Sequence, residues 1–126
     1  MPQLKRAFMF KRISFTTIPV QDQARALDFY TKKLGLQVFT DQPMGEDRWI
    51  ELKVNGGETR LVLHKQPKPA GASSPGVVFV VDSVGATYEE LTAKAVEFTQ
   101  PPKKEHWGEH AIFKDSEGNL VLIGAN

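Results

Sequence analysis

Carboxylates and imidazoles on predicted strands are the side chains of this 126-residue chain that could do acid–base chemistry. Glu51 lies in "RWIELKV", His64 lies in "TRLVLHK" and Glu109 begins "EHAIFK", and the composition of these segments favours strands. A carboxylate on an apolar wall would be desolvated, and desolvation is one way in which proteins tune a general base. The alternative is that these side chains point to solvent at a sheet margin or lie in a dimer interface.

The numbers of histidine and cysteine residues limit which metal-binding and nucleophilic chemistry the chain can perform. The chain has three histidines and no cysteine, which excludes disulfides, thiolate nucleophiles and cysteine-ligated zinc. His106 and His110 lie in "EHWGEH", where His and Glu recur at several spacings. That segment does not match the H-E-x-x-H zinc pattern. It therefore offers only a fallback metal site, and a lone histidine is more often a surface or packing residue.

Composition and charge are typical of a single soluble domain. Apolar residues make up 40% of the chain, charged residues make up 25%, and the net charge is +1. This balance gives no reason to expect a nucleic acid or a membrane as partner. The N-terminal apolar run is interrupted by Lys11 and Arg12, which makes it too short for a signal peptide or a membrane span. We expect a cytoplasmic protein.

The strands and the helix that position these residues are predicted first in the N-terminal half of the chain. "ISFTTIPV" predicts a strand over 13–20, and "DQARALDFYTKKLG" predicts a helix with Asp22 as its N-cap and Gly35 just beyond its end. Further strands are predicted over 36–40, 48–54 and 59–65, the last two flanking an "NGGE" turn. "QPKPAGASSPG", residues 66–76, predicts a linker.

The same pattern then starts again. Strands are predicted over 77–81, 96–100, 109–114 and 119–124, with a helix from Asp82 and a loop over 101–108. A constant offset of 60 residues, without a gap, relates the two copies: Asp22 to Asp82, Gly35 to Ala95, Val38 to Phe98 and Asn55 to Asp115. Each copy reads βαβββ, and such an internal repeat fixes an α+β architecture.

Tandem βαβββ units, with "ALDFYTKKLG" opening the first and "FKDSEGN" closing the second, resemble the vicinal oxygen chelate superfamily. That group includes glyoxalase I, bleomycin-resistance proteins, fosfomycin-resistance enzymes and extradiol dioxygenases. The resemblance covers residues 11–124 and implies a single domain, with module 1 at about 11–65, the linker at 66–76 and module 2 at about 77–124. It also implies a curved mixed sheet around a cup, with the helices on the outer face.

Strand alternation then assigns side chains either to the helices or to the cup. Ile18 and Val20 are expected under the first helix. A turn centred on 56–57 pairs Glu51 with Val62 and Trp49 with His64, all facing the cup. The repeat places Leu122, Ala111 and Glu109 at the positions of Val62, Glu51 and Trp49. The candidate ligand-binding residues are Phe15, Trp49, Val62, His64, Val78, Trp107 and Leu122.

Enzymes of the resembled family hold a divalent metal with four cup-facing residues, typically His, Gln or Glu. Several nitrogen or oxygen ligands fix such a cation and leave positions open for vicinal substrate oxygens. Carried over to this chain, the four positions are Phe15, Val62, Gly76 and Leu122. None of these side chains can bind a metal, so the resemblance implies the fold without the usual metal site.

The leading hypothesis is a metal-independent protein that binds a largely apolar or aromatic small molecule in the cup, with no cofactor. Arg48 and Arg60 could orient an anionic ligand. The alternative is a lyase, isomerase or dioxygenase with a displaced divalent-metal or acid–base site at Glu51, His64 and Glu109. A third possibility is a structural dimerisation module with a filled cup. A homodimer is expected in each case. In proteins that this chain resembles, βαβββ modules pair within a chain or between chains, and the sheets of a single copy would otherwise present long apolar edges.

Overall fold

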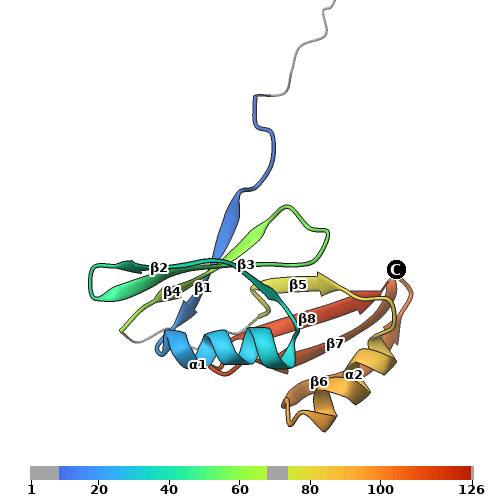
Figure 1. Cartoon of the computed structure of the whole chain (residues 1–126). Helices are drawn as coiled ribbons and strands as arrows, with labels where there is room; N and C mark the ends of the chain where they lie inside the picture. Colours follow the sequence, from blue (N-terminus) through green and yellow to red (C-terminus); the bar gives the residue numbers. More distant parts are fainter. Residues whose placement is uncertain (1–8, 68–73, 126) are drawn as a thin grey trace, which may run out of the picture.

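The computed structural model describes residues 9–67 and 74–125, and it contains two βαβββ modules in tandem (Figure 1). Module 1 consists of β1 (Phe15–Val20), α1 (Gln23–Asp28), a π-helical turn η1 (Phe29–Lys33), β2 (Gln37–Met44), β3 (Asp47–Lys53) and β4 (Arg60–Lys65). Module 2 consists of β5 (Val77–Val80), α2 (Val84–Ala93), β6 (Phe98–Glu105), β7 (Gly108–Lys114) and β8 (Leu120–Ala125). The predicted α+β class with two tandem βαβββ modules is confirmed.

Two further observations bear on the linker and on a possible membrane span. Residues 68–73 of the predicted linker lie outside the described residues. No helix within 9–67 or 74–125 is long and apolar enough to cross a membrane.

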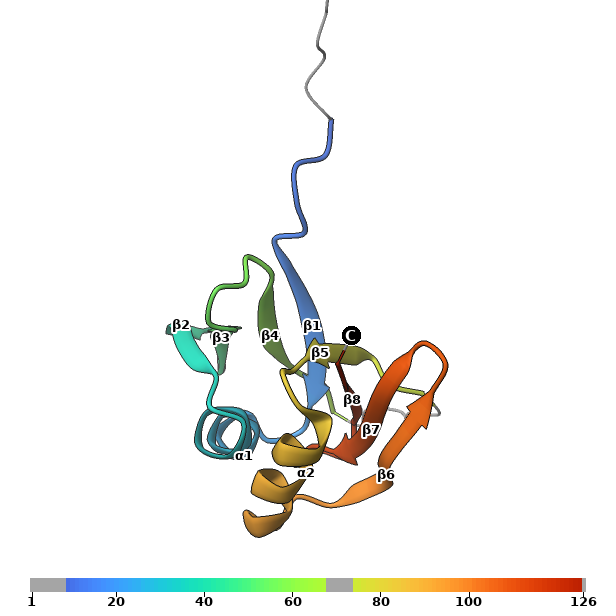
Figure 2. The same cartoon turned by 90° about the vertical axis from the view of Figure 1, so that its right-hand side faces the viewer.

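Each module forms a mixed four-stranded sheet with the same strand order. The orders are β1-β4-β3-β2 and β5-β8-β7-β6, and in each sheet the first strand runs parallel to the last. A parallel connection needs a crossover, and the helix of each module supplies it. Glu51 pairs with Val62 between β3 and β4, as predicted. Figure 2 shows the two sheets next to each other, and residues of β1 and β5 line a common hollow.

Each α-helix begins after a residue whose side chain caps its first turn. The Asp22 carboxylate accepts the Arg25 N–H at 2.9 Å and caps α1. In the second module the cap is Ser83, whose hydroxyl accepts the Ala86 N–H at 3.1 Å. The predicted cap Asp82 is therefore wrong by one residue. A hydroxyl and a carboxylate both cap well, and here the hydroxyl of Ser83 takes that role.

The two copies are not related by one constant offset. The loop between β7 and β8, residues 115–119, is one residue shorter than its counterpart in module 1, residues 54–59. As a result Leu122 pairs with Ile112, and Ala111 pairs with Ile123. A shift of one residue turns every side chain of a strand to the opposite face. The predicted equivalence of Ala111 with Glu51 is therefore wrong.

The predicted loop over 101–108 is also wrong for most of its length. β6 runs on to Glu105, and only His106 and Trp107 form the turn to β7. The register of β6 breaks between Gln100 and Lys103, where the two consecutive prolines lie. Proline is tolerated there because β6 is the edge strand of its sheet.

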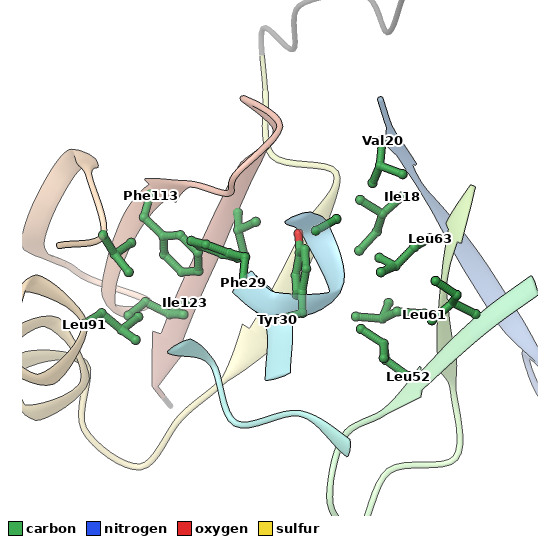
Figure 3. Packing of buried hydrophobic residues seen from close by; sticks show 14 of the residues in the cluster. Ile18, Val20, Phe29, Tyr30, Leu52, Leu61, Leu63, Leu91, Phe113 and Ile123 are labelled. Atoms are coloured by element: carbon green, nitrogen blue, oxygen red, sulfur yellow. The ribbon is translucent and has the colours of Figure 1, made fainter. Parts of the chain in front are cut away.

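The hydrophobic core lies between the two modules and is shared by them (Figure 3). Phe29 and Tyr30 of η1 lie between the two sheets, and the ring centroids of Phe29 and Phe113 are 6.3 Å apart. The buried strand residues are Ile18, Val20, Ile50, Leu52, Leu61 and Leu63 in module 1, and Ala111, Phe113, Val121 and Ile123 in module 2. Both sheets thus turn their helix-covered sides toward one core and their other sides outward.

Candidate functional site

The strand residues that alternate with the core residues form an outward surface on each sheet. Outer face 1 consists of Phe15, Thr17, Trp49, Glu51, Lys53, Arg60, Val62 and His64. Outer face 2 consists of Val78, Val80, His110, Ile112, Leu120 and Leu122. Except on β7, these are the faces that the sequence predicted to line the cup. In this chain they point away from the shared core.

An aromatic pair covers the centre of outer face 1. Phe15 on β1 and Trp49 on β3 meet edge to face, with ring centroids 5.5 Å apart and ring planes at 85°. Because β4 lies between those strands, the rings meet above it, and the outward Val62 of β4 is only 1% exposed. The predicted ligand-binding residue Val62 is thus covered by the two rings in this chain.

The hollow beside this aromatic pair is small. It is lined in part by Trp49, Val62 and His64 and has a volume of about 40 Å³. Pockets for drug-sized ligands are roughly 300 to 1,000 Å³. Outer face 1 by itself therefore supplies one wall of a site but not an enclosed cavity.

The acid–base residues predicted to act together do not meet. Glu51 and His64 share outer face 1, and Glu51 Oε2 accepts a hydrogen bond from Trp49 Nε1 at 2.7 Å. Glu109 lies on the same side of β7 as the buried Ala111, which is the core side. The shorter loop before β8 causes this difference. The prediction that Glu109 faces the cup is wrong.

His110 occupies the outward position that sequence reasoning gave to Glu109. It corresponds to Trp49 of module 1, and Ile112 corresponds to Glu51, once the shorter loop is counted. The His110 ring stacks on Trp107 in the β6–β7 turn, with centroids 5.0 Å apart. Its Nδ1 atom is buried and has no hydrogen-bond partner among the described residues. Comparing the lengths of the two hairpin loops would have found this residue.

Outer face 2 is a largely apolar surface that is most exposed on β5. Val78 and Val80 of β5 are 63% and 74% exposed. Val78 pairs with Leu122, which pairs in turn with Ile112, so three apolar side chains lie side by side across three strands. Contiguous apolar surface of this kind marks interaction or ligand-binding sites.

The four residues that the resemblance implies at the family's metal positions do not fit a metal ion. Phe15 and Val62 lie in strands of module 1, Gly76 directly precedes β5, and Leu122 lies in β8. None of the four side chains has a donor atom for a cation. The described residues contain no group of three or more His, Asp or Glu side chains that could hold a metal.

Arg48 and Arg60, the two arginines considered for ligand binding, have different surroundings. Arg48 is engaged by Asp41 through two hydrogen bonds of 2.6 and 3.1 Å, and these raise the pKa of Arg48 above its ordinary value. The guanidinium carbon of Arg60 lies 3.6 Å from the ring centroid of Phe39. Only Arg60 belongs to outer face 1.

Comparison with known sequences finds relatives along almost the whole chain. Residues 12–123 match the Glyoxalase/Bleomycin resistance protein/Dioxygenase superfamily. YetH, an uncharacterized protein of Bacillus subtilis strain 168, is 36% identical over 118 residues, which cover 91% of this chain and 98% of YetH.

Solved structures of similar fold agree with the sequence match. TnmS3, an antibiotic binding protein from Streptomyces sp. CB03234, has a TM-score of 0.84 at 30% identity, covering 94% of this chain and 98% of TnmS3. A superfamily member from Sphaerobacter thermophilus DSM 20745 has a TM-score of 0.84 at 28% identity, covering 94% and 100%. The repeated βαβββ fold, the matched range and the identity to YetH together show that this chain belongs to the glyoxalase/bleomycin resistance protein/dioxygenase superfamily.

Proposed function

We propose that this protein binds a largely apolar or aromatic small molecule without a metal, between outer faces supplied by two copies of the chain. The observation that carries the proposal is the set of residues at the family's metal positions. Phe15, Val62, Gly76 and Leu122, the residues that the family resemblance implies there, have no side-chain donor atom for a metal. A site built from them would have apolar walls, which is typical of small-molecule pockets, and would lack the groups that metal chemistry needs.

A second copy is part of the proposal because one chain cannot enclose a ligand. The two outer faces of a chain point away from their common core (Figures 1 and 3). In a two-fold dimer each contact occurs twice. Outer face 1 of one copy would then lie opposite outer face 2 of the other, which makes two equivalent cups.

The binding role is supported by one relative and by the placement of the acid–base residues. TnmS3, at 30% identity, is an antibiotic binding protein, and sequestration of a toxic compound is one use of such a cup. The enzymatic alternative required Glu51, His64 and Glu109 to converge. Glu109 lies on the core side of β7, so binding is the function that the geometry supports best.

The test combines oligomeric state with ligand binding. We expect sedimentation equilibrium to show a dimer at micromolar concentration, and calorimetric titration with 2-naphthamide to give one bound molecule per chain. Treatment with EDTA should leave the affinity unchanged. Binding that appears only after addition of Ni²⁺, Zn²⁺, Mn²⁺ or Fe²⁺ would contradict the proposal.

Two valine variants separate the cup from a general effect of surface charge. Val78→Asp places a carboxylate on outer face 2, and it should weaken both dimerisation and naphthamide binding at least about tenfold. Val38 is also exposed, at 46%, but it pairs with Leu52 on the core side of β3. Val38→Asp should therefore leave both equilibria near the wild-type values. Equal losses in the two variants would count against outer face 2 as a cup wall.

A further inference from the structure

We infer that the ligand carries an anionic group, a carboxylate on an aromatic framework, which Arg60 binds on outer face 1. The inference rests on the proposed function and adds the chemical class of the ligand. It follows from three observations: the charges that lie next to each other on this face, the absence of a counter-charge, and the orientation of the Arg60 guanidinium.

Two cations lie side by side on outer face 1. Arg60 on β4 pairs with Phe15 on β1 and, on its other side, with Lys53 on β3. Residues directly opposite each other in a sheet project from the same face. Like charges in this arrangement repel each other and destabilise the strand pair unless an anion lies between them.

The chain does not supply that anion among the residues that the structure describes. Ion pairs engage Arg25 with Glu117 at 2.8 Å and Arg48 with Asp41 at 2.6 Å. In residues 9–67 and 74–125 no ion pair includes Arg60 or Lys53. The residues outside those ranges contain no Asp or Glu.

The one carboxylate on the same face is already engaged. Glu51 Oε2 accepts the indole N–H of Trp49 at 2.7 Å, and neither of its oxygens lies within ion-pair distance of Arg60 or Lys53. Outer face 1 therefore carries the cations Arg60 and Lys53 but only one carboxylate, Glu51, which already accepts a hydrogen bond. The charge of this face is positive. This balance favours an anionic ligand over a cationic one.

The Arg60 guanidinium is held in an orientation that suits a carboxylate. Its carbon lies 3.6 Å over the centre of the Phe39 ring, a cation–π contact that covers one flat side of the group. The in-plane N–H groups make no hydrogen bond within the described part of the chain. A guanidinium presents these N–H groups as a rigid fork that matches a carboxylate.

Phe15, the residue next to Arg60 on β1, indicates where the rest of the ligand would lie. Phe15, which pairs with Arg60, meets Trp49 edge to face. The Arg60 guanidinium itself lies over Phe39 of β2, so a ligand whose aromatic part rests on Phe15 and Trp49 would have to extend over β3 to bring its carboxylate to Arg60. The structure thus assigns the aromatic pair to the apolar part of the ligand and Arg60 to its charge.

The experiment compares 2-naphthoate with 2-naphthamide, which are close in shape and differ in charge. We expect wild-type protein to bind naphthoate about tenfold more tightly than naphthamide, the equivalent of one charge-assisted contact. Arg60→Gln should weaken naphthoate binding about tenfold and naphthamide binding much less, so that the preference is lost. Arg60→Lys should retain part of the preference, because it keeps the charge but loses the fork. Raising the salt concentration should weaken naphthoate binding alone.

Arg48→Gln is the matched control, because it removes an arginine that Asp41 already neutralises. It should leave the preference for naphthoate intact, and thermal denaturation should show that all variants are folded. Equal binding of the two probes to wild-type protein, or equal loss of both in Arg60→Gln, would overturn the anion site and leave the binding function standing. Failure of both probes to bind at millimolar concentration would overturn the proposed function together with this inference.

Discussion

The hydroxyl of Tyr30 in the first module donates a hydrogen bond to Asp115 Oδ2 in the second module at 2.6 Å. Both residues are buried, and burial beside the Asp115 charge raises the pKa of Tyr30 well above its ordinary value. Asp115 also accepts N–H groups from Glu117 and Asn119 within its own turn. The turn that closes module 2 is therefore joined directly to the helical segment of module 1.

Removing this hydroxyl should weaken the contact between the modules. In Tyr30→Phe, Asp115 keeps its backbone N–H donors but loses the hydrogen bond from the Tyr30 hydroxyl. We expect the free energy of unfolding to fall by about 1–2 kcal/mol. Urea denaturation measures the loss. Tyr88→Phe is the control, because Tyr88 packs against Phe98 without a side-chain hydrogen bond in the described residues. An equal effect of both substitutions would show that the Tyr30–Asp115 bond contributes nothing specific.

Glu117 should make stability depend on pH in the acid range. Burial alone would raise the pKa of Glu117, but hydrogen bonds from the Arg25 side chain and from the backbone N–H groups of Gln21 and Asp22 outweigh it and lower the pKa to about 2. Because the folded-state pKa lies below the unfolded value of 4.5, the ionised form stabilises the fold above that pH. This stabilisation is lost as the pH falls from about 4.5 toward 2.

The measurement is the stability difference between wild-type protein and Glu117→Gln as a function of pH. We expect the difference to be largest near neutral pH and to shrink steadily below about pH 4.5. Asp28→Asn serves as the control, because the Asp28–Lys32 pair is exposed to solvent and such pairs contribute little. A difference that stays constant down to pH 2 would contradict the assigned role of Glu117.

Gly108 should resist substitution because of the backbone at the start of β7. Its φ is +138°, and an added Cβ would lie 2.7 Å from the carbonyl oxygen of Ala125. Gly108→Ala should lower the free energy of unfolding by about 1–3 kcal/mol. Gly85→Ala is the matched control, because no atom lies within 4 Å of its Cβ position in α2. That control should be neutral or stabilising by up to about 1 kcal/mol, as thermal denaturation would show.

The absence of cysteine allows a direct test of the β7 register. A single cysteine introduced at Ile112 would point to outer face 2, and one introduced at Ala111 would point into the core. We expect maleimide to label Ile112→Cys faster than Ala111→Cys under native conditions. A strictly constant 60-residue repeat requires the reverse order, so the ratio of the two labelling rates decides between the two registers.

Local pattern predicted most of module 1. The glycine pair at 56–57 fixed the turn between β3 and β4 and hence the pairing of Glu51 with Val62. Alternation along β1 correctly placed Ile18 and Val20 under the helix. These features depend on neighbouring residues alone, which is why the sequence was enough to predict them.

Module 2 and the arrangement of the modules depend on information that is not local. One residue fewer in a loop reversed the faces of β7 and exchanged Glu109 for His110 at the outer face. The shared core depends on Phe29 meeting Phe113 across the two modules, a contact between segments far apart in the chain. Strand alternation showed which residues share a face but not whether the two faces enclose a space.

The shorter loop between β7 and β8 gives the molecule a built-in asymmetry. It places Ile112 and His110, rather than Ala111 and Glu109, on outer face 2. In the proposed dimer, an aromatic and cationic wall would then oppose an aliphatic wall that has the stacked His110 and Trp107 at its margin. A ligand held between two such different walls would bind in a single orientation.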